Sequence, residues 1–409
     1  MKHTRRFAIT EARAVPTGEY TMSYTFDVPT RVLFGPGALK RLHEEKLPGK
    51  KALVVISSGR SVRANGYLAA LEAELDAAGV AHALFDKVQA NPLEPTVQEG
   101  VEAGRAQGAD FVVALGGGSV MDAAKTIAAM IPQRGGRVWD YMATGTSEHR
   151  PFNAPPLPFV AITTSAGTGS EVDAGAVITS PVTHEKGAFF SRCPALAVVD
   201  PELMLSVPPK FTAYQGFDAL FHNTEGYISK FGNEMGAMVE LEAIRLIGKW
   251  LPVAVADGSN LEARTKVAFA STLGGYSMDV STCTSEHAIE HALSGRHQDL
   301  PHGAGLILIS LAYYKAFIDR HDCDEKFVEM ARALGKADAT KPEDFLDALA
   351  ALQKACGVDA LRMSDWGIRE DELPGMAPLA RKAVGMLFSC DPSPLSDDDV
   401  LAILKESYR

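Results

Sequence analysis

The sequence predicts a two-domain protein in which an α/β domain built on a parallel sheet is followed by an all-α domain. In the first half, apolar runs of strand length alternate with amphipathic runs of helical length, which is typical of a parallel sheet covered by helices. After Pro208, apolar residues recur at helical spacing and strand-like alternation almost disappears. The chain of 409 residues is long enough for each half to bury its own core. We therefore expect one domain over 1–205 and a second over 206–409.

The first domain opens with a polar stretch over 1–22, which we expect to form an irregular arm or an added edge strand. A short strand over 31–37 follows and ends in turn residues. Strand-like and helical segments then alternate, and the Gly- and Pro-rich stretch 133–156 predicts a long surface loop. The further strands expected are 52–57, 82–85, 109–115, 158–163, 175–180 and 195–199, and the helices are 62–78, 97–107 and 120–130.

Helical periodicity fills the second domain almost without interruption. Its long segments carry apolar residues at the three- and four-residue spacing of one helix face. The helices expected are 211–229, 235–254, 260–280, 283–295, 303–319, 341–356, 369–386 and 396–407.

Composition excludes several classes of partner. The net charge is −11, whereas a protein that binds nucleic acid or an anionic membrane needs clustered Lys and Arg to neutralise phosphates. No apolar run reaches the roughly 20 residues that a membrane helix needs. The five cysteines are scattered and contain no Cys-x-x-Cys pair, which argues against a disulfide framework and fits a reducing cytoplasm. We therefore expect a cytoplasmic protein without nucleic-acid or membrane partners.

Metal-binding side chains concentrate in one stretch of the second domain. Asp218 and His222 are four residues apart in an apolar, helix-like run, and His287 and His291 repeat that spacing. Residues at this spacing project from the same face of a helix. His302 follows a proline at the start of the next apolar run, where it can enter a site from a helix start. One carboxylate oxygen and three imidazole nitrogens suit ferrous iron or zinc and leave a position open for a substrate oxygen.

A chance arrangement is the alternative, because a histidine in a protein core is more often structural than a metal ligand. Three separate segments nevertheless supply suitable atoms, although the chain has only 11 histidines. We therefore expect a metal site in the second domain.

The motifs Asp-x-x-x-His, His-x-x-x-His and Pro-His-Gly of this stretch resemble the metal-binding signatures of the iron-containing (group III) alcohol dehydrogenases. The resemblance implies that the ligands of a divalent ion, Fe²⁺ or alternatively Zn²⁺, are Asp218, His222, His287 and His302.

The same resemblance implies that His291 is not a ligand and lies beside the nicotinamide of a cofactor. Because an imidazole titrates near neutral pH, we expect His291 to relay the proton to solvent. The segment between His287 and His302 is longer than in the family and contains His297. His297 is therefore an alternative to His302 as the fourth ligand.

The stretch from Val112 to Lys125 predicts a strand, a triple-glycine turn and a helix start. Glycines let a pyrophosphate approach backbone N–H groups, and a helix N-terminus favours negative charge. A tight structural turn is the alternative, because the spacing matches no common nucleotide fingerprint. The string Gly-Gly-Gly-Ser-x-x-Asp-x-x-Lys resembles the same family. We expect Ser119 to cap the helix, and Asp122 to orient the loop or a ribose while Lys125 offsets its charge. The cofactor-binding residues expected here are Gly116, Gly117, Gly118, Ser119 and Asp122.

A hydroxyl-rich loop follows the strand expected at 158–163. Taken alone it is an ordinary loop, but it stands where the family carries its Thr-Thr-x-Gly-Thr-Gly-Ser-Glu signature, which implies a second nucleotide contact. Lys186 also matches the family pattern, in which a lysine faces the nicotinamide ribose. A solvated surface lysine is the alternative. The hydroxyl residues expected to contact the cofactor are Thr163, Thr164, Thr168 and Ser170.

The resemblance spans nearly the whole chain from residue 31 to the segment 394–401. It implies a Rossmann-like nucleotide-binding domain and an all-α metal-binding domain, as in dehydroquinate synthase-type folds, with the active cleft between them. The implied activity is reversible hydride transfer between a small primary alcohol or aldehyde and NAD(P), with a metal as Lewis acid. We also expect a homodimer or higher homo-oligomer.

Two other functions stay open. One is a metal-independent reductase like the maleylacetate reductases, against which the intact pair of Asp218 and His222 argues. The other is a catalytically silent protein that binds a nucleotide or a metal.

The end of the strand expected at 52–57 bears on the choice of cofactor. Enzymes that select NAD commonly place a carboxylate there, which binds the adenosine ribose and repels a 2′-phosphate. Ser57 and Ser58 occupy the place in this chain, whereas many family members carry an Asp. Two hydroxyls accommodate a phosphate, and Arg60 or Arg63 can pair with it, so we expect a preference for NADPH. The alternative is that the serines merely end a strand and both cofactors are accepted.

Overall fold

The apolar runs of the first half form one parallel sheet, as predicted. The computed structural model describes residues 27–409, so the arm expected over 1–22 lies outside the described residues. Six strands pair in the order β1-β8-β5-β4-β2-β3. They are β1 (Arg31–Phe34), β2 (Lys51–Ser57), β3 (Ala81–Val88), β4 (Phe111–Gly116), β5 (Phe159–Thr163) and β8 (Leu196–Val199).

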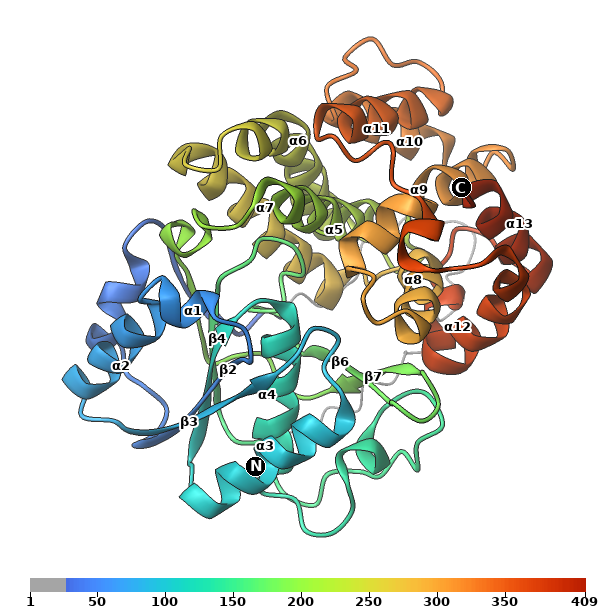
Figure 1. Cartoon of the computed structure of the whole chain (residues 1–409). Helices are drawn as coiled ribbons and strands as arrows, with labels where there is room; N and C mark the ends of the chain where they lie inside the picture. Colours follow the sequence, from blue (N-terminus) through green and yellow to red (C-terminus); the bar gives the residue numbers. More distant parts are fainter. Residues whose placement is uncertain (1–26) are drawn as a thin grey trace, which may run out of the picture.

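Helices cover both faces of this sheet (Figure 1). Alternate side chains of β2 enter two different cores, because successive residues of a strand point to opposite faces. Leu53 packs with α3 and α4, whereas Val54 packs with α2 and η1. The helix expected over 62–78 is divided, because Gly66 adopts a left-handed conformation (φ 76°) before α2. The helical elements are η1 (Ala38–Glu44), α1 (Ser61–Ala64), α2 (Tyr67–Ala77), α3 (Glu94–Gln107), α4 (Gly118–Met130), η2 (Val138–Tyr141) and η3 (Pro201–Met204).

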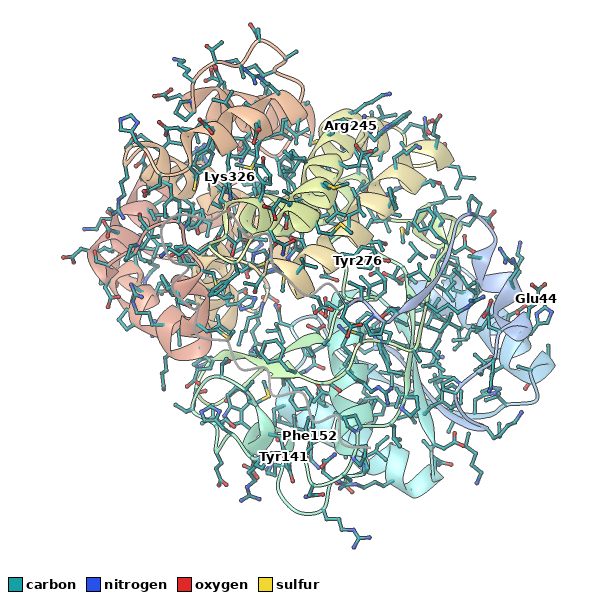
Figure 2. The ribbon with its side chains drawn as sticks, turned by 180° about the vertical axis from the view of Figure 1, so that it is seen from behind. Glu44, Tyr141, Phe152, Arg245, Tyr276 and Lys326 are labelled. Atoms are coloured by element: carbon teal, nitrogen blue, oxygen red, sulfur yellow. The ribbon has the colours of Figure 1, made fainter. Side chains whose placement is uncertain are left out.

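A small antiparallel hairpin stands apart from the main sheet. It consists of β6 (Gly175–Thr179), which the sequence predicted, and β7 (Lys186–Phe190), which it did not. Phe189 of β7 packs against Phe152, which in turn stacks on Tyr141 with ring centroids 6.0 Å apart (Figure 2). The stretch 133–156, expected to be a surface loop, is therefore anchored to the hairpin by aromatic contacts.

The second half is helical, as predicted, and packs around a core of its own (Figure 1). One helix, α10, was not predicted, and the helix expected over 369–386 is divided at Gly375 and Gly385. No helix among residues 27–409 is long and apolar enough to cross a membrane. The elements are α5 (Pro209–Ile228), α6 (Glu234–Ala256), α7 (Leu261–Val280), α8 (Ser285–Arg296), α9 (His302–Ile318), α10 (Asp324–Ala333), α11 (Glu343–Ala355), η4 (Met363–Trp366), η5 (Glu370–Gly375), α12 (Met376–Val384), η6 (Gly385–Ser389) and α13 (Asp397–Ser407).

The two halves meet closely where the loop after β5 touches α7. A Cβ atom on Gly169 would lie 2.3 Å from the backbone nitrogen of Gly275, so neither glycine leaves room for a side chain. Tyr276, the next residue of α7, packs against the cores of both halves (Figure 2). The boundary between residues 205 and 206 stays a prediction. This contact fixes the loop after β5 against the helical domain, on the side that faces the candidate site.

Candidate metal centre and nucleotide cleft

The four ligands implied by the sequence motifs come together in the helical domain. Helix α5 carries Asp218 and His222 one turn apart, α8 carries His287, and His302 is the first residue of α9. The Nε2 atoms of His222, His287 and His302 lie 3.3, 3.8 and 3.5 Å from Oδ1 of Asp218. Three imidazole nitrogens therefore surround one carboxylate oxygen.

The atoms at the centre of this cluster fit a metal ion. Oδ1 of Asp218 and Nε2 of His287 are buried and have no hydrogen-bond partner. Buried polar atoms are nearly always paired, so these two point to a ligand. One carboxylate oxygen and three imidazole nitrogens are also a donor set that Fe²⁺ and Zn²⁺ accept. The residues present thus fit a divalent ion.

Each imidazole is held by its other nitrogen. Nδ1 of His287 is hydrogen-bonded to Glu225, Nδ1 of His302 to Glu290, and Nδ1 of His222 lies 3.3 Å from Sγ of Cys283. A partner on Nδ1 fixes the tautomer and leaves Nε2 free for a metal, as in many metal sites.

Sequence reasoning missed both glutamates. A signal was present, since the pattern His-x-x-Glu occurs after His222 and again after His287. The pairing is crossed, however, because Glu225 binds the histidine of α8 and Glu290 binds the histidine of α9.

The protonation states of Asp218 and His222 suit metal binding. Burial raises the pKa of Asp218, but the neighbouring His222 and His302 outweigh it and bring the pKa to about 2. Burial lowers the pKa of His222 to about 3. At neutral pH these two groups are an anion and a neutral imidazole, which are the forms that bind metals.

Glycine at position 303 explains the close approach of the first turn of α9 to α5. A Cβ atom there would lie 2.1 Å from the carbonyl oxygen of Tyr214 on α5. The missing side chain lets the start of α9 approach α5 and carries His302 to Asp218.

His291 lies beside the cluster on α8. Its ring centroid is 6.3 Å from that of His287 and 5.4 Å from that of His302. The residue is buried and its Nδ1 has no hydrogen-bond partner. Burial, followed by the charge of Lys186, lowers the pKa of His291 well below its ordinary value, which differs from the near-neutral titration expected from the sequence. His291 is thus a neutral imidazole with a free nitrogen.

His297 is not brought to the cluster. It follows the last residue of α8, and its Nε2 lies 2.8 Å from Oε2 of Glu372. Its ring is therefore engaged elsewhere, and the structure favours His302 over His297 as the fourth ligand.

The triple-glycine turn connects β4 to the N-terminus of α4. A Cβ atom on Gly118 would lie 2.5 Å from the Thr168 methyl group, so this turn and the loop after β5 fit together only with glycine. The first N–H groups of a helix lack partners within it and are ready to bind a phosphate. The expected cap is wrong: Gly117 is the N-cap, and Ser119, inside the helix, accepts a hydrogen bond from the Asn91 backbone. The N-terminus of α4 therefore still offers backbone N–H groups to a phosphate, although no serine caps the helix.

Asp122 is hydrogen-bonded to the loop after β5 and to β6, whereas the sequence predicted that it orients the triple-glycine turn or a ribose, and both of those roles stay predictions. Its carboxylate accepts hydrogen bonds from the Ser170 hydroxyl and the Val177 backbone N–H, each at 3.0 Å. Burial raises the pKa of Asp122 to about 6, against the charge of Lys125. The direct ion pair of Lys125 is with Asp173, at 2.6 Å, so it offsets the charge of Asp122 from a distance.

Lys186 is a buried residue and not a solvated one. Only 4% of it is exposed, and its Nζ donates hydrogen bonds to Oδ1 of Asn91 at 3.2 Å and Oγ of Ser294 at 2.9 Å. Asn91, which also binds Ser119, was not singled out from the sequence. Asn91 has a left-handed backbone (φ 51°) in the turn after β3, and no sequence motif marks it as a functional residue.

A cavity of about 200 Å³ joins the histidine cluster to the triple-glycine turn. Asp173 and Asp279, which sequence reasoning missed, add two carboxylates to its wall. The predicted residues that line it are Gly118, Ser119, Asp122, Thr168, Ser170, Lys186, His222, His287, His291 and His302. The predicted residues outside its lining are Ser57, Ser58, Gly116, Gly117, Thr163, Thr164 and Asp218.

Comparisons with known proteins agree with this geometry. The model of the family "Iron-containing alcohol dehydrogenase" matches residues 29–201, and that of the C-terminal domain of the Fe-containing family matches residues 212–408. The 1,3-propanediol dehydrogenase of Klebsiella pneumoniae is 34% identical over 95% of this chain and 100% of its own length. The NAD-dependent methanol dehydrogenase of Bacillus methanolicus is 31% identical over 93% of this chain and 99% of its own.

Solved structures that resemble this chain also include alcohol dehydrogenases. An archaeal halo-thermophilic alcohol dehydrogenase from a Red Sea brine pool superposes with a TM-score of 0.89, at 33% identity over 95% of this chain and 100% of its own. A 1,3-propanediol oxidoreductase superposes with a TM-score of 0.85, at 32% identity over 94% of this chain and 100% of its own. Family models, relatives and structures together show that this chain belongs to the iron-containing alcohol dehydrogenases, oxidoreductases that act on CH–OH groups with a metal and NAD(P).

Proposed function

We propose that the enzyme interconverts small primary alcohols and aldehydes with Fe²⁺, or alternatively Zn²⁺, held by Asp218, His222, His287 and His302. The observation that carries the proposal is the unpartnered Oδ1 of Asp218 with three Nε2 atoms around it, beside a cavity that reaches the phosphate turn. The names of relatives, for 1,3-propanediol and methanol, support short primary alcohols as the substrate class.

The residues around the cavity would have separate roles in metal binding, cofactor binding and proton transfer. When bound, the ion supplies Lewis-acid polarisation of a substrate oxygen and the nicotinamide supplies hydride chemistry. The glycines and hydroxyls of the two loops would hold the cofactor, and Lys186 would face its ribose. His291, whose ring lines the cavity and whose Nδ1 has no hydrogen-bond partner, would accept the alcohol proton and pass it toward solvent.

Metal analysis combined with an aldehyde panel tests this function. The purified protein should contain close to one iron or zinc per chain, and short aldehydes should drive NADPH or NADH oxidation. Removing the metal with a chelator should stop turnover, and adding Fe²⁺ or Zn²⁺ should restore it. Turnover that survives complete metal removal would contradict the proposal and favour a metal-independent reductase.

We also propose that NADPH is preferred over NADH. Ser57 ends β2 and Ser58 is exposed beside it, so β2 itself ends without a carboxylate. Arg63 pairs with the nearby Asp86. Arg60, at the N-cap of α1, is therefore the better placed cation for a 2′-phosphate.

Replacing Ser57 by Asp should shift the preference toward NADH. A new carboxylate repels the 2′-phosphate, and like charges placed together cost several kcal/mol, so the NADPH to NADH ratio of kcat/KM should fall by about 10- to 100-fold. Ser61→Asp adds the same charge on the exposed first residue of α1 and is the matched control, for which a smaller shift is expected. A wild type that favours NADH, or equal shifts in both variants, would show that Ser57 does not set the choice.

Assembly and location complete the proposal. We propose a homodimer or higher homo-oligomer, which light scattering of the purified protein tests. A cytoplasmic location is supported by the five cysteines, all of which are free thiols.

A further inference from the structure

Glu290 on α8 holds two side chains with one carboxylate oxygen. Its Oε2 is hydrogen-bonded to Nδ1 of His302 and lies 3.9 Å from Nζ of Lys186. The residue is wholly buried, and the absence of a side chain at Gly305 makes room for it, since a Cβ atom there would lie 2.7 Å from the glutamate Oε1. The carboxylate therefore has two neighbours that can carry positive charge and no access to water.

The two neighbours belong to different parts of the molecule. His302 begins α9 and faces Asp218, whereas Lys186 begins β7 of the α/β half and is otherwise held by the neutral groups of Asn91 and Ser294. A buried ammonium group needs a nearby anion. Among residues 27–409, the carboxylate of Glu290 is the acidic group within 4 Å of the Lys186 ammonium.

Glu225 offers a contrast at the same metal site. Its carboxylate is hydrogen-bonded to His287 in the way that Glu290 is bonded to His302. Its other bonds, from the backbone N–H of Thr284 at 3.0 Å and the hydroxyl at 2.9 Å, come from the helical half alone. Glu225 therefore serves the metal site without touching the nucleotide side.

We propose that Glu290 is a positioning residue that aims His302 at the metal and Lys186 at the nucleotide, so that one carboxylate supports the affinity for both. The inference rests on the proposed function, because it assumes that the cluster holds a metal and that Lys186 faces the cofactor.

The test measures two affinities in six variants of the full chain, four with single and two with double substitutions. Zinc affinity is measured by competition with a chromogenic chelator, and NADPH affinity by fluorescence titration of the zinc-saturated protein. Glu290→Gln and Glu225→Gln should each weaken zinc binding by about 10- to 100-fold, as expected for a partner of a metal-bound histidine. Only Glu290→Gln should also weaken NADPH binding, by about 10-fold, a typical size for the coupling of two groups in contact.

Lys186→Met supplies the second half of the test. Alone it should weaken NADPH binding. In the Glu290→Gln background its effect should largely disappear, since both changes break the same contact, whereas in the Glu225→Gln background it should persist in full. Equal NADPH affinities in the two glutamate variants, or full additivity of Lys186→Met with Glu290→Gln, would overturn the proposal.

Two further readouts separate positioning from general damage and from failure of the proposed function. Glu290→Asp keeps the charge on a shorter side chain, so a positioning role predicts that it restores part of both affinities lost in Glu290→Gln. Should Glu290→Gln not fold, losses in Glu290→Asp confined to zinc or to NADPH would overturn the proposal, and joint losses would support it. A wild type that binds no zinc would contradict the proposed function itself, whereas zinc binding with unlinked losses would contradict only the role of Glu290.

Discussion

The His222→Ala variant is expected to lose its bound metal and at least about 10³-fold in turnover, because Lewis-acid catalysis supplies several kcal/mol of transition-state stabilisation. The substitution removes one of the three Nε2 atoms around Asp218 and leaves its carboxylate buried with fewer partners. The α/β half should still fold, since it has cores of its own on both faces of the sheet. Metal content by mass spectrometry and kcat for a short aldehyde are the measurements.

His297→Ala is the matched control for that experiment. The same residue type is removed close to the site, but His297 is bonded to Glu372 and not to the cluster. The control should keep its metal, and circular dichroism should show both variants folded. An undiminished metal content and full activity in His222→Ala would remove the metal-centred mechanism, and loss of metal in His297→Ala would restore His297 as a ligand.

The His291→Ala variant is expected to keep its metal while kcat falls by about 10²- to 10⁴-fold, the range for a lost acid–base group. The ring of His291 lines the cavity beside the rings of His287 and His302, but its Nδ1 makes no hydrogen bond to a ligand of the cluster. Metal stoichiometry and kcat, measured on the same preparation, separate the two roles.

His291→Asn is the companion variant. An amide of similar size fills the space and can hydrogen-bond, but it cannot accept the proton, so its kcat should be as low as that of the alanine variant. Loss of metal in either variant would make His291 a ligand. A kcat recovered in the asparagine variant would show that the imidazole fills space and does not move a proton.

Local patterns predicted most of the helices and most of the strands. Long periodic segments such as α5 and α9 were found within two residues of their ends, because each has an apolar face that tertiary packing does not override. β7 was missed because Lys-Gly-Ala-Phe-Phe shows no alternation, and β6 is its strand partner in the hairpin. The helix α10 was missed because its ten residues are half charged or polar.

The candidate metal ligands could be predicted from the sequence, but the glutamates in contact with them and with Lys186 could not. The spacing of Asp218 from His222 places both on one helix face wherever the helix lies. The hydrogen bond between Glu225 and His287 and the 3.9 Å ion pair between Glu290 and Lys186 depend on how α5, α8 and β7 pack, which no sequence spacing contains. The order of the strands is likewise a property of the whole chain.

The position of β1 has a consequence for how the chain folds. β1 comes first among the described strands, yet within residues 27–409 it pairs only with β8, which comes last, Arg31 opposite Leu196. Closing so long a loop costs entropy before any contact compensates for it, so this pairing is intrinsically slow. During synthesis, β1 therefore has no strand partner among residues 27–409 until nearly the whole first half has left the ribosome. The sheet can then close before His287 and His302, which complete the metal cluster, have been translated.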